Sequence, residues 1–203
     1  MRTNQEGVHV IRRMLAAAAA AAVALVPVGM AQPAKAADPV VFTVGILNDV
    51  DSLNPFTGIL AESYEIFQIQ YSTLMQPNST DFTPGPGLAE SWEESADGKT
   101  WTYTLRPDLL WSDGTPLTSA DVVYTFNRIL DGRYEKTNFG NYTRNITSVT
   151  ATDERTVVMT VKKPTPIMEK LAVYILPEHV WSSIDGKAVK SYANEPAEGE
   201  TTV

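Results

Sequence analysis

Few side chains in this sequence could carry out covalent chemistry. It has no cysteine and two histidines, His9 and His179. His179 lies in the stretch LPEHVW, where Pro177 and Glu178 predict the first turn of a helix and give the histidine a surface or capping role. Neither a histidine-based triad nor a zinc site is expected from so few ligands. We therefore predict a protein that is not an enzyme and that holds no metal and no cofactor.

Carboxylates and glycines are more plentiful, but their spacing matches no common site. The loop Asn48–Asn54 alternates oxygen-bearing side chains, yet it lacks the glycine and the final glutamate of a calcium loop, so local Asx-turns are favoured. Gly85 and Gly87 are interrupted by prolines, which remove the backbone donors that a phosphate loop needs. Glycosidase carboxylates pair through space rather than by spacing, so a secreted hydrolase is the alternative that we retain.

Aromatic residues are the remaining candidates for binding. Trp92, Trp101 and Trp111 fall on or beside predicted strands, where large aromatic side chains usually belong to a core. Trp111 is expected to pack beneath the helix that follows it. Phe139 and Tyr142 instead occur in a predicted loop with glycine and asparagine, and loop aromatics held by a scaffold are candidates for ligand contact.

The elements that must position these residues form a mixed α/β pattern. A helix is predicted at Ser119–Leu130, where Thr118 and Asp121 form a capping box, and another at Glu62–Met75, which Pro77 closes. The other predicted elements are a strand at 40–46, hairpins of 91–95 with 100–106 and of 145–153 with 155–163, short helices at 166–174 and 176–181, and connectors at 48–58, 82–91 and 133–144.

The N-terminus has the pattern of a secretory leader. Arg12 and Arg13 precede the uncharged apolar run Met14–Met30, and Ala34 and Ala36 supply small residues for cleavage. The run is short for a membrane span and is broken by a proline, so we expect residues 1–36 to be removed rather than kept as an anchor. The arginine pair leaves both the general and the twin-arginine export routes open.

The charge balance argues against polyanionic partners. The chain has 16 basic and 24 acidic residues, and without the four basic residues and one acidic residue of the leader 12 and 23 remain, a net charge of −11. Such a chain is not expected to bind nucleic acid or an anionic membrane surface. The leader has no cysteine for lipid attachment, so we expect a periplasmic or extracellular protein that associates with the cell envelope only through a membrane partner.

Several motifs together resemble one known family. The segment Leu88–Leu130, LAESWEESADGKTWTYTLRPDLLWSDGTPLTSADVVYTFNRIL, resembles the signature region of the extracellular solute-binding proteins of family 5, the dipeptide- and oligopeptide-binding components of ABC importers. DSLNPF with ESYEIFQIQYSTLM resembles the family's first loop and helix, and SVTATDERTVVMTVKKPTPIMEKLA with ILPEHVW resembles its later hairpin and the segment that follows. Glu178 stands where the family usually has a basic residue.

The resemblance implies the N-terminal part of a type II periplasmic-binding-protein-like fold. Residues 37–77 would begin ligand-binding lobe I, residues 78–172 would form an extra domain of hairpins and a helix, and residues 173–203 would return towards lobe I. Family members are considerably longer, and the second lobe is absent from this sequence. We therefore expect an N-terminal fragment whose ligand cleft is one-sided.

The resemblance also implies a ligand and a place for it. The ligand is expected to be a peptide held through backbone groups, with an oligosaccharide as the runner-up and an ABC permease as the partner of a monomer. Phe139 and Tyr142 would reach one end of the cleft, and Gly58 would let the backbone approach the ligand closely. The loop after the first strand would supply the other contacts: Thr57, Gly58, Ile59, Leu60, Ala61, Glu62 and Ser63. With one side missing, we expect no affinity better than about millimolar, because most of the ligand stays wet.

Overall fold

The structure, a computed structural model, describes residues 42–184 and 186–195. The predicted leader lies outside the described residues. The chain divides into two units, and the smaller one contributes only residues 42–44, which form neither helix nor strand. No helix in the described ranges is long and apolar enough to cross a membrane. The elements below all belong to the larger unit, which begins at Gly45.

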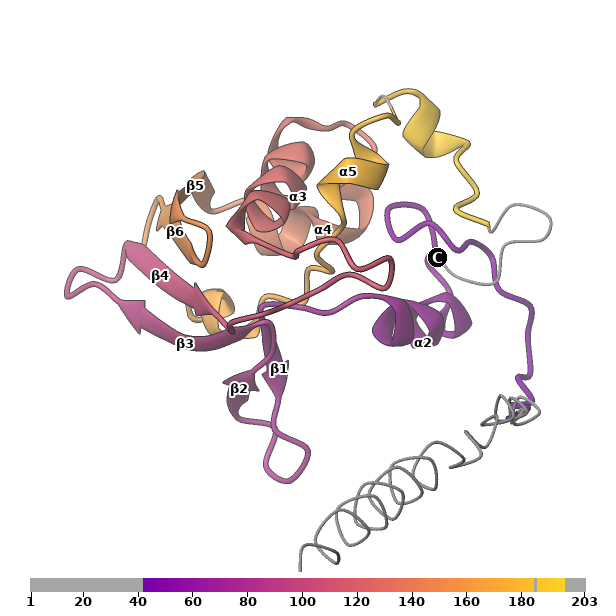
Figure 1. Ribbon diagram of the computed structural model, residues 1–203, viewed down its shortest axis with the longest axis horizontal. Coiled ribbons are helices and arrows are strands. Elements are labelled where there is room, and N and C mark those ends of the chain that lie inside the picture. The colour runs from indigo at the N-terminus through magenta and orange to yellow at the C-terminus, as the bar shows by residue number, and fades with distance from the viewer. Residues whose placement is uncertain (1–41, 185, 196–203) are drawn as a thin grey trace, which may run out of the picture. The chain divides into compact units, whose positions relative to one another are not determined.

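An antiparallel sheet of four strands supports much of the core (Figure 1). Its strand order is β3-β4-β6-β5, so the two predicted hairpins are confirmed and meet through β4 and β6. On β4, Trp101, Tyr103 and Leu105 are buried and the threonines between them are half-exposed, as the alternation of a half-buried strand requires. The strands are β3 (Ala89–Glu94), β4 (Thr100–Leu105), β5 (Ile146–Asp153) and β6 (Thr156–Val161).

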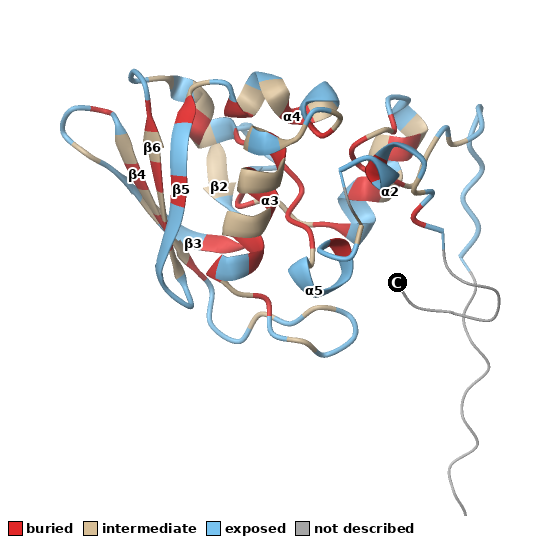
Figure 2. Cartoon of the chain, turned by 90° about the horizontal axis from the view of Figure 1, so that it is seen from above, coloured by how far each residue is buried: buried red, intermediate tan, exposed pale blue. Residues whose placement is uncertain are grey.

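Helix α3 (Ser119–Asp131) lies against this sheet and contacts β5 and β6 (Figure 2). The predicted capping box is present: the Thr118 hydroxyl accepts a hydrogen bond from Ala120 N–H, and the Asp121 carboxylate accepts one from Thr118 N–H at 2.9 Å. The cap fixes the start of the helix, so that its apolar stripe meets the sheet. The residues of this stripe that are fully buried are Val122, Phe126 and Ile129.

The tryptophans that were predicted to belong to the core do so. Trp101 is 2% exposed, and Trp92 and Trp111 are half-buried against the same cluster of apolar side chains. Trp111 therefore packs at the margin of the core. Gly114 follows it with a φ of +85°, which a turn residue without a Cβ adopts without strain.

The predicted first strand is wrong over the residues that the structure describes. Residues 42–46 form no strand, and Phe42, Val44 and Ile46 are exposed. Extended backbone becomes a strand only when a neighbouring chain segment pairs with its N–H and C=O groups, so an alternating sequence does not by itself form one. The apolar residues do alternate in this stretch, but alternation produces a strand only when the stretch pairs with a sheet.

The predicted helix 62–75 is shorter than expected. Helix α2 covers Ala61–Gln70, and Met75–Pro77 forms strand β1, which pairs with β2 (Pro84–Pro86). The carbonyls of Thr73 and Leu74 accept hydrogen bonds from the N–H groups of Leu88 and Ala89, so pairing with a distant segment replaces the last helical turn. The same pairing places β2 and the start of β3 within the predicted connector 82–91.

Two further stretches also differ from the prediction. Residues 133–144, predicted as a loop, contain helix α4 (Lys136–Thr143). The predicted helix 166–174 is only a 3-10 turn, η1 (Pro166–Lys170), followed by an extended segment that is buried from Val173 to Leu176. Short helix α5 (Glu178–Trp181) is confirmed, and a second 3-10 turn, η2 (Ala188–Lys190), follows it.

His179 is a surface histidine, as predicted, but it has a partner. Its Nε2 lies 2.8 Å from a carboxylate oxygen of Asp113, in the turn after Trp111. The N–H of Thr115 donates a hydrogen bond to the other oxygen at 2.8 Å. This backbone hydrogen bond, followed by the contacts with the Thr115 and His179 side chains, lowers the pKa of Asp113 to about 2. The pair links the turn 111–115 to α5.

The lowered pKa of Asp113 predicts a loss of stability in acid. Because the folded state favours the carboxylate, its contribution is complete above the ordinary pKa of 3.8 and disappears as the pH falls towards about 2. We expect the urea midpoint of the wild type to fall more steeply over this interval than that of Asp113→Asn, since the other carboxylates are common to both proteins. Parallel pH profiles for the two proteins would contradict the link.

Candidate functional site

The loop before α2 is organised by one carboxylate. Asp51 accepts hydrogen bonds from Ile59 N–H at 2.9 Å, from Leu60 N–H at 3.2 Å and from the Ser63 hydroxyl at 2.5 Å. Desolvation acts to raise the pKa of Asp51, but these hydrogen bonds outweigh it and hold the pKa below its ordinary value. Asp51 therefore stays ionised at neutral pH and fixes the chain where the loop enters the helix.

Asn54 folds the middle of the loop. Its side-chain oxygen accepts a hydrogen bond from Phe56 N–H at 2.9 Å, and its backbone carbonyl accepts from the N–H groups of Thr57 and Gly58. The Asx-turn predicted for this stretch is thus confirmed. The amide nitrogen of the same side chain, which is fully buried, donates to the carbonyls of Val189 and Tyr192 at 2.8 Å each.

Hydrogen bonds from outside complete the fixation of the loop. The amide nitrogen of Asn194 donates to the carbonyl of Leu53 at 2.9 Å and to the Tyr71 hydroxyl at 3.0 Å. The amide nitrogen of Asn138 on α4 donates to the carbonyls of Pro55 and Gly58 at 2.9 and 2.7 Å. The loop is therefore held by two segments that lie far from it in the sequence, α4 and residues 189–194.

The predicted site residues of this loop separate into two groups. Ile59 and Leu60 are 66% and 42% exposed, and Ala61 is also exposed, so these side chains are accessible. Thr57 and Glu62 are half-buried and engaged with Ser52 and Asn48 respectively. Two predicted residues, Gly58 and Ser63, are buried and face the interior.

Gly58 has an internal reason to be glycine. A Cβ at this position would lie 2.6 Å from the Phe67 ring and 3.0 Å from the carbonyl of Ser52. The sequence predicted that Gly58 lets the backbone approach a ligand, whereas the close neighbour that the structure shows is the α2 side chain Phe67.

The two predicted aromatic contacts also differ from each other. Phe139 is 2% exposed and packs edge-on against Phe56 and Tyr174, with ring centroids 6.0 and 6.1 Å apart. Tyr142 on α4 is half-buried. Of the two, only Tyr142 presents an accessible ring.

Sequence reasoning missed two tyrosines that lie near Tyr142. Tyr64 on α2 and Tyr174 on the buried segment after η1 have ring centroids 6.4 Å apart. Burial raises the pKa of both, and the proximity of Tyr142 adds to each shift. No periodic signal joins residues 64, 142 and 174, because they meet only through the packing of α2, α4 and the segment 171–176.

A cavity of about 590 Å³ adjoins the loop. It is lined by Val50–Leu53 and Thr57 on one side and by residues 190–193 and 195 on the other. The lining includes the acidic residues Asp51 and Glu195 and the basic residue Lys190, whose ammonium group lies 5.9 Å from the centroid of the Tyr134 ring. The arrangement can bind polar groups of both charges, and the described residues contain no group of three His, Cys, Asp or Glu that could hold a metal.

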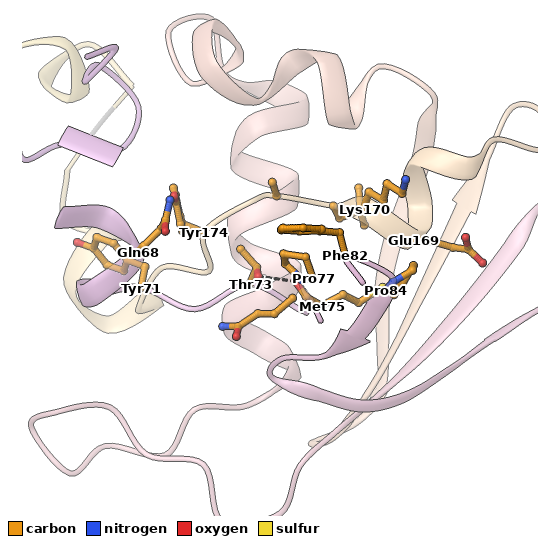
Figure 3. A pocket seen from close by; sticks show the side chains of 13 residues that line it. Gln68, Tyr71, Thr73, Met75, Pro77, Phe82, Pro84, Glu169, Lys170 and Tyr174 are labelled. Carbon is orange, nitrogen blue, oxygen red and sulfur yellow. Dashed lines mark hydrogen bonds between the residues drawn. The ribbon is translucent and has the colours of Figure 1, made fainter. Parts of the chain in front are cut away.

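A second cavity, of about 560 Å³, lies between the end of α2, the β1–β2 hairpin and η1 (Figure 3). Gln68, Tyr71 and Tyr174 stand on one side of it, and Phe82 and Lys170 on the other. None of the predicted ligand-contacting residues lines this cavity. The cavity beside the loop is therefore the better match to the predicted site.

Comparison with known proteins places this geometry in context. Residues 83–201 match the family model described as bacterial extracellular solute-binding proteins, family 5 Middle. The chain is 35% identical over 118 residues to the periplasmic oligopeptide-binding protein OppA of Escherichia coli, which covers 46% of the chain and 20% of OppA. It is 35% identical over 153 residues to protein XP55 of Streptomyces lividans, which covers 72% of the chain and 26% of XP55.

A solved structure has the same fold over two thirds of the chain. The binding protein AgaA of A. tumefaciens R10, in complex with agropinic acid, superposes with a TM-score of 0.61 at 30% identity, over 66% of this chain and 28% of AgaA. The chain thus spans about a fifth to a quarter of the length of the curated relatives. The mixed α/β arrangement is that of part of a periplasmic binding protein.

Proposed function

Since the chain belongs to the bacterial extracellular solute-binding proteins of family 5, we propose that it supplies one side of the binding site of a receptor for peptides. The receptor captures its solute outside the cytoplasmic membrane and delivers it to an ABC permease. The family's members are periplasmic or extracellular binding proteins rather than enzymes, and we propose that this chain likewise carries out no covalent chemistry.

The observation that carries this proposal is the rigid loop beside a cavity with both charges. A short peptide has an ammonium group at one end and a carboxylate at the other. Asp51 and Glu195 suit the former, and Lys190 suits the latter. A loop whose backbone is already fixed loses little conformational entropy when a ligand binds. The name of the relative OppA, an oligopeptide-binding protein, supports the same class of ligand.

We propose the same division of the chain as the sequence suggested. Residues 37–77 and 173–203 belong to lobe I, and residues 78–172 form the extra domain. The bonds from Asn54 to Val189 and Tyr192 support the grouping of the first and third segments. The sheet, α3 and α4 all lie within the middle segment, which supports its treatment as a separate domain.

Titration of the isotope-labelled chain with di- to pentapeptides tests the proposal. We expect dissociation constants weaker than about 1 mM, because one-sided burial leaves most of the ligand in water. Amide shift changes should concentrate at Asp51, Thr57–Leu60, Tyr142 and Lys190. The control is Lys190→Gln, which should reduce the response to peptides but not to their C-terminal amides.

Two outcomes would contradict the proposal. Amide shift changes centred on the strands β3 to β6 instead of the loop, or no amide shift change at tens of millimolar peptide, would remove the peptide assignment. A stronger response to cello- or manno-oligosaccharides would favour the sugar alternative, for which the rings of Tyr64 and Tyr142 offer stacking surfaces.

A further inference from the structure

Asn138 contacts the candidate ligand loop from a different part of the chain. Its single amide nitrogen donates to the carbonyls of Pro55 and Gly58, at 2.9 and 2.7 Å, across 83 and 80 residues of sequence. Both partners are carbonyl oxygens, so only the nitrogen of the side chain can make these bonds. One side chain thereby fixes both ends of a four-residue turn.

Among the described residues, no N–H group of the loop is recorded as a donor to the carbonyls of Pro55 and Gly58, so these carbonyls depend on a donor outside the loop. The N–H groups of Thr57 and Gly58 both point to the carbonyl of Asn54, and those of Ile59 and Leu60 point to Asp51. These four backbone N–H groups are therefore satisfied within the loop. The carbonyls of Pro55 and Gly58 receive their hydrogen bonds from α4.

Helix α4, which carries Asn138, is itself held in place by packing. Phe139, the next residue, is buried against Phe56 and Tyr174. The Thr143 hydroxyl donates to the carbonyl of Phe139 at 3.3 Å within the same helix. The packing of Phe139 on Phe56 and the bonds of Asn138 to Pro55 and Gly58 join the same helix to the same loop. An apolar contact and a pair of hydrogen bonds thus fix the loop relative to α4.

We propose that Asn138 is a positioning residue for the ligand loop. It holds Pro55–Gly58 in the conformation that presents Thr57, Ile59 and Leu60 to the solute. The extra domain thereby sets the shape of the lobe I edge without contacting the solute at this position. The geometric part of this inference is independent of the ligand, and its meaning for binding rests on the proposed function.

Amide hydrogen exchange of the whole chain tests the geometry. In Asn138→Ala and in the isosteric Asn138→Asp, which lacks the two donors, we expect exchange at Thr57, Gly58 and Ile59 to accelerate by about tenfold or more. Exchange in β4 and β6 should stay as in the wild type. Asn138→Gln, which keeps the amide, should restore part of the protection.

Asn141→Ala is the matched control, because this asparagine is exposed on the same helix. It should leave exchange in the loop unchanged. Unaltered loop exchange in both Asn138→Ala and Asn138→Asp would overturn the proposal. Acceleration of the loop and the sheet by the same factor would also overturn it, because Asn138 would then contribute only to global stability.

The same variants separate this inference from the proposed function. If peptides shift no resonance of the wild type but loop exchange responds to Asn138→Ala, the peptide assignment fails and the positioning role stands. If peptides bind and Asn138→Ala leaves both their affinity and loop exchange unchanged, the positioning role fails alone. A loss of affinity by about tenfold at unchanged sheet exchange is the result that we expect when both hold.

Discussion

Replacing Arg128 with methionine is expected to lower the free energy of unfolding by about 3–5 kcal/mol. Arg128 on α3 pairs with Glu135 at 3.2 Å, and the two side chains are 11% and 1% exposed. Its guanidinium also donates to the carbonyls of Trp181 and Ile184 at 2.6 and 2.5 Å, and to the Tyr124 hydroxyl. Methionine fills similar space but makes none of these bonds. The variant leaves a buried carboxylate and two carbonyls without their donor.

The buried carboxylate accounts for most of this expected loss. One oxygen of Glu135 already has no hydrogen-bond partner among the described residues. Without Arg128 the other oxygen also loses its partner, and an unpaired charge in the interior is strongly unfavourable. Glu135→Leu in the Arg128→Met background should therefore recover a large part of the lost stability, since apolar replacements of buried pairs are often neutral.

Urea denaturation of the single and double variants measures these terms. Arg133→Met is the matched control, because Arg133 is exposed and lies over the Tyr134 ring in a cation–π contact at 5.9 Å. It should change the free energy of unfolding by less than about 0.5 kcal/mol. If Arg128→Met changed the free energy of unfolding as little as this control does, the bonds of Arg128 would not stabilise the packing of α3 on the segment 181–184.

The elements that were predictable from sequence are those whose signal is local. The two hairpins, of which the first turns around Gly98, and the capped helix α3 follow from turn residues, alternation and a capping box, all within short windows. Gly98 has the positive φ of +68° that its turn requires. These features need no knowledge of the rest of the chain, and they are confirmed.

The elements that were missed depend on partners far away in sequence. The end of the predicted helix 62–75 became strand β1 because it pairs with β2 and with Leu88 and Ala89. Helix α4 has asparagine and glycine in its interior and weak amphipathicity, so its sequence resembles a loop. It forms because Phe139 and Thr143 find buried positions. Tertiary packing overrides propensity in both cases.

The candidate site was predictable only in outline. The family resemblance located the loop Thr57–Ser63, and the structure keeps Ile59 and Leu60 accessible there. The asparagines that hold the loop come from residues 138 and 194, and no motif links them to it. A polar side chain that binds a backbone carbonyl has no spacing rule, so such positions are found only once the fold is known.

Replacing Phe139 with alanine is expected to destabilise the chain by about 3–5 kcal/mol. The ring is 2% exposed and makes T-shaped contacts with Phe56 and Tyr174. Its removal leaves a cavity where α4, the loop and the segment 171–176 meet, and it also removes two aromatic contacts. The loss is a property of the core, so it should occur equally in the presence and absence of peptide.

Tyr142→Ala is the matched control for this prediction, because Tyr142 lies three residues further along α4 and is half-buried. We expect this variant to change the free energy of unfolding by about 1 kcal/mol or less and to weaken the response of the chain to peptides. Urea denaturation and peptide titration of both variants measure the two effects separately. A stable Phe139→Ala variant with weakened peptide response would show instead that Phe139 contacts the ligand. The buried position of its ring argues for the opposite assignment, in which Phe139 supports the loop and Tyr142 meets the solute.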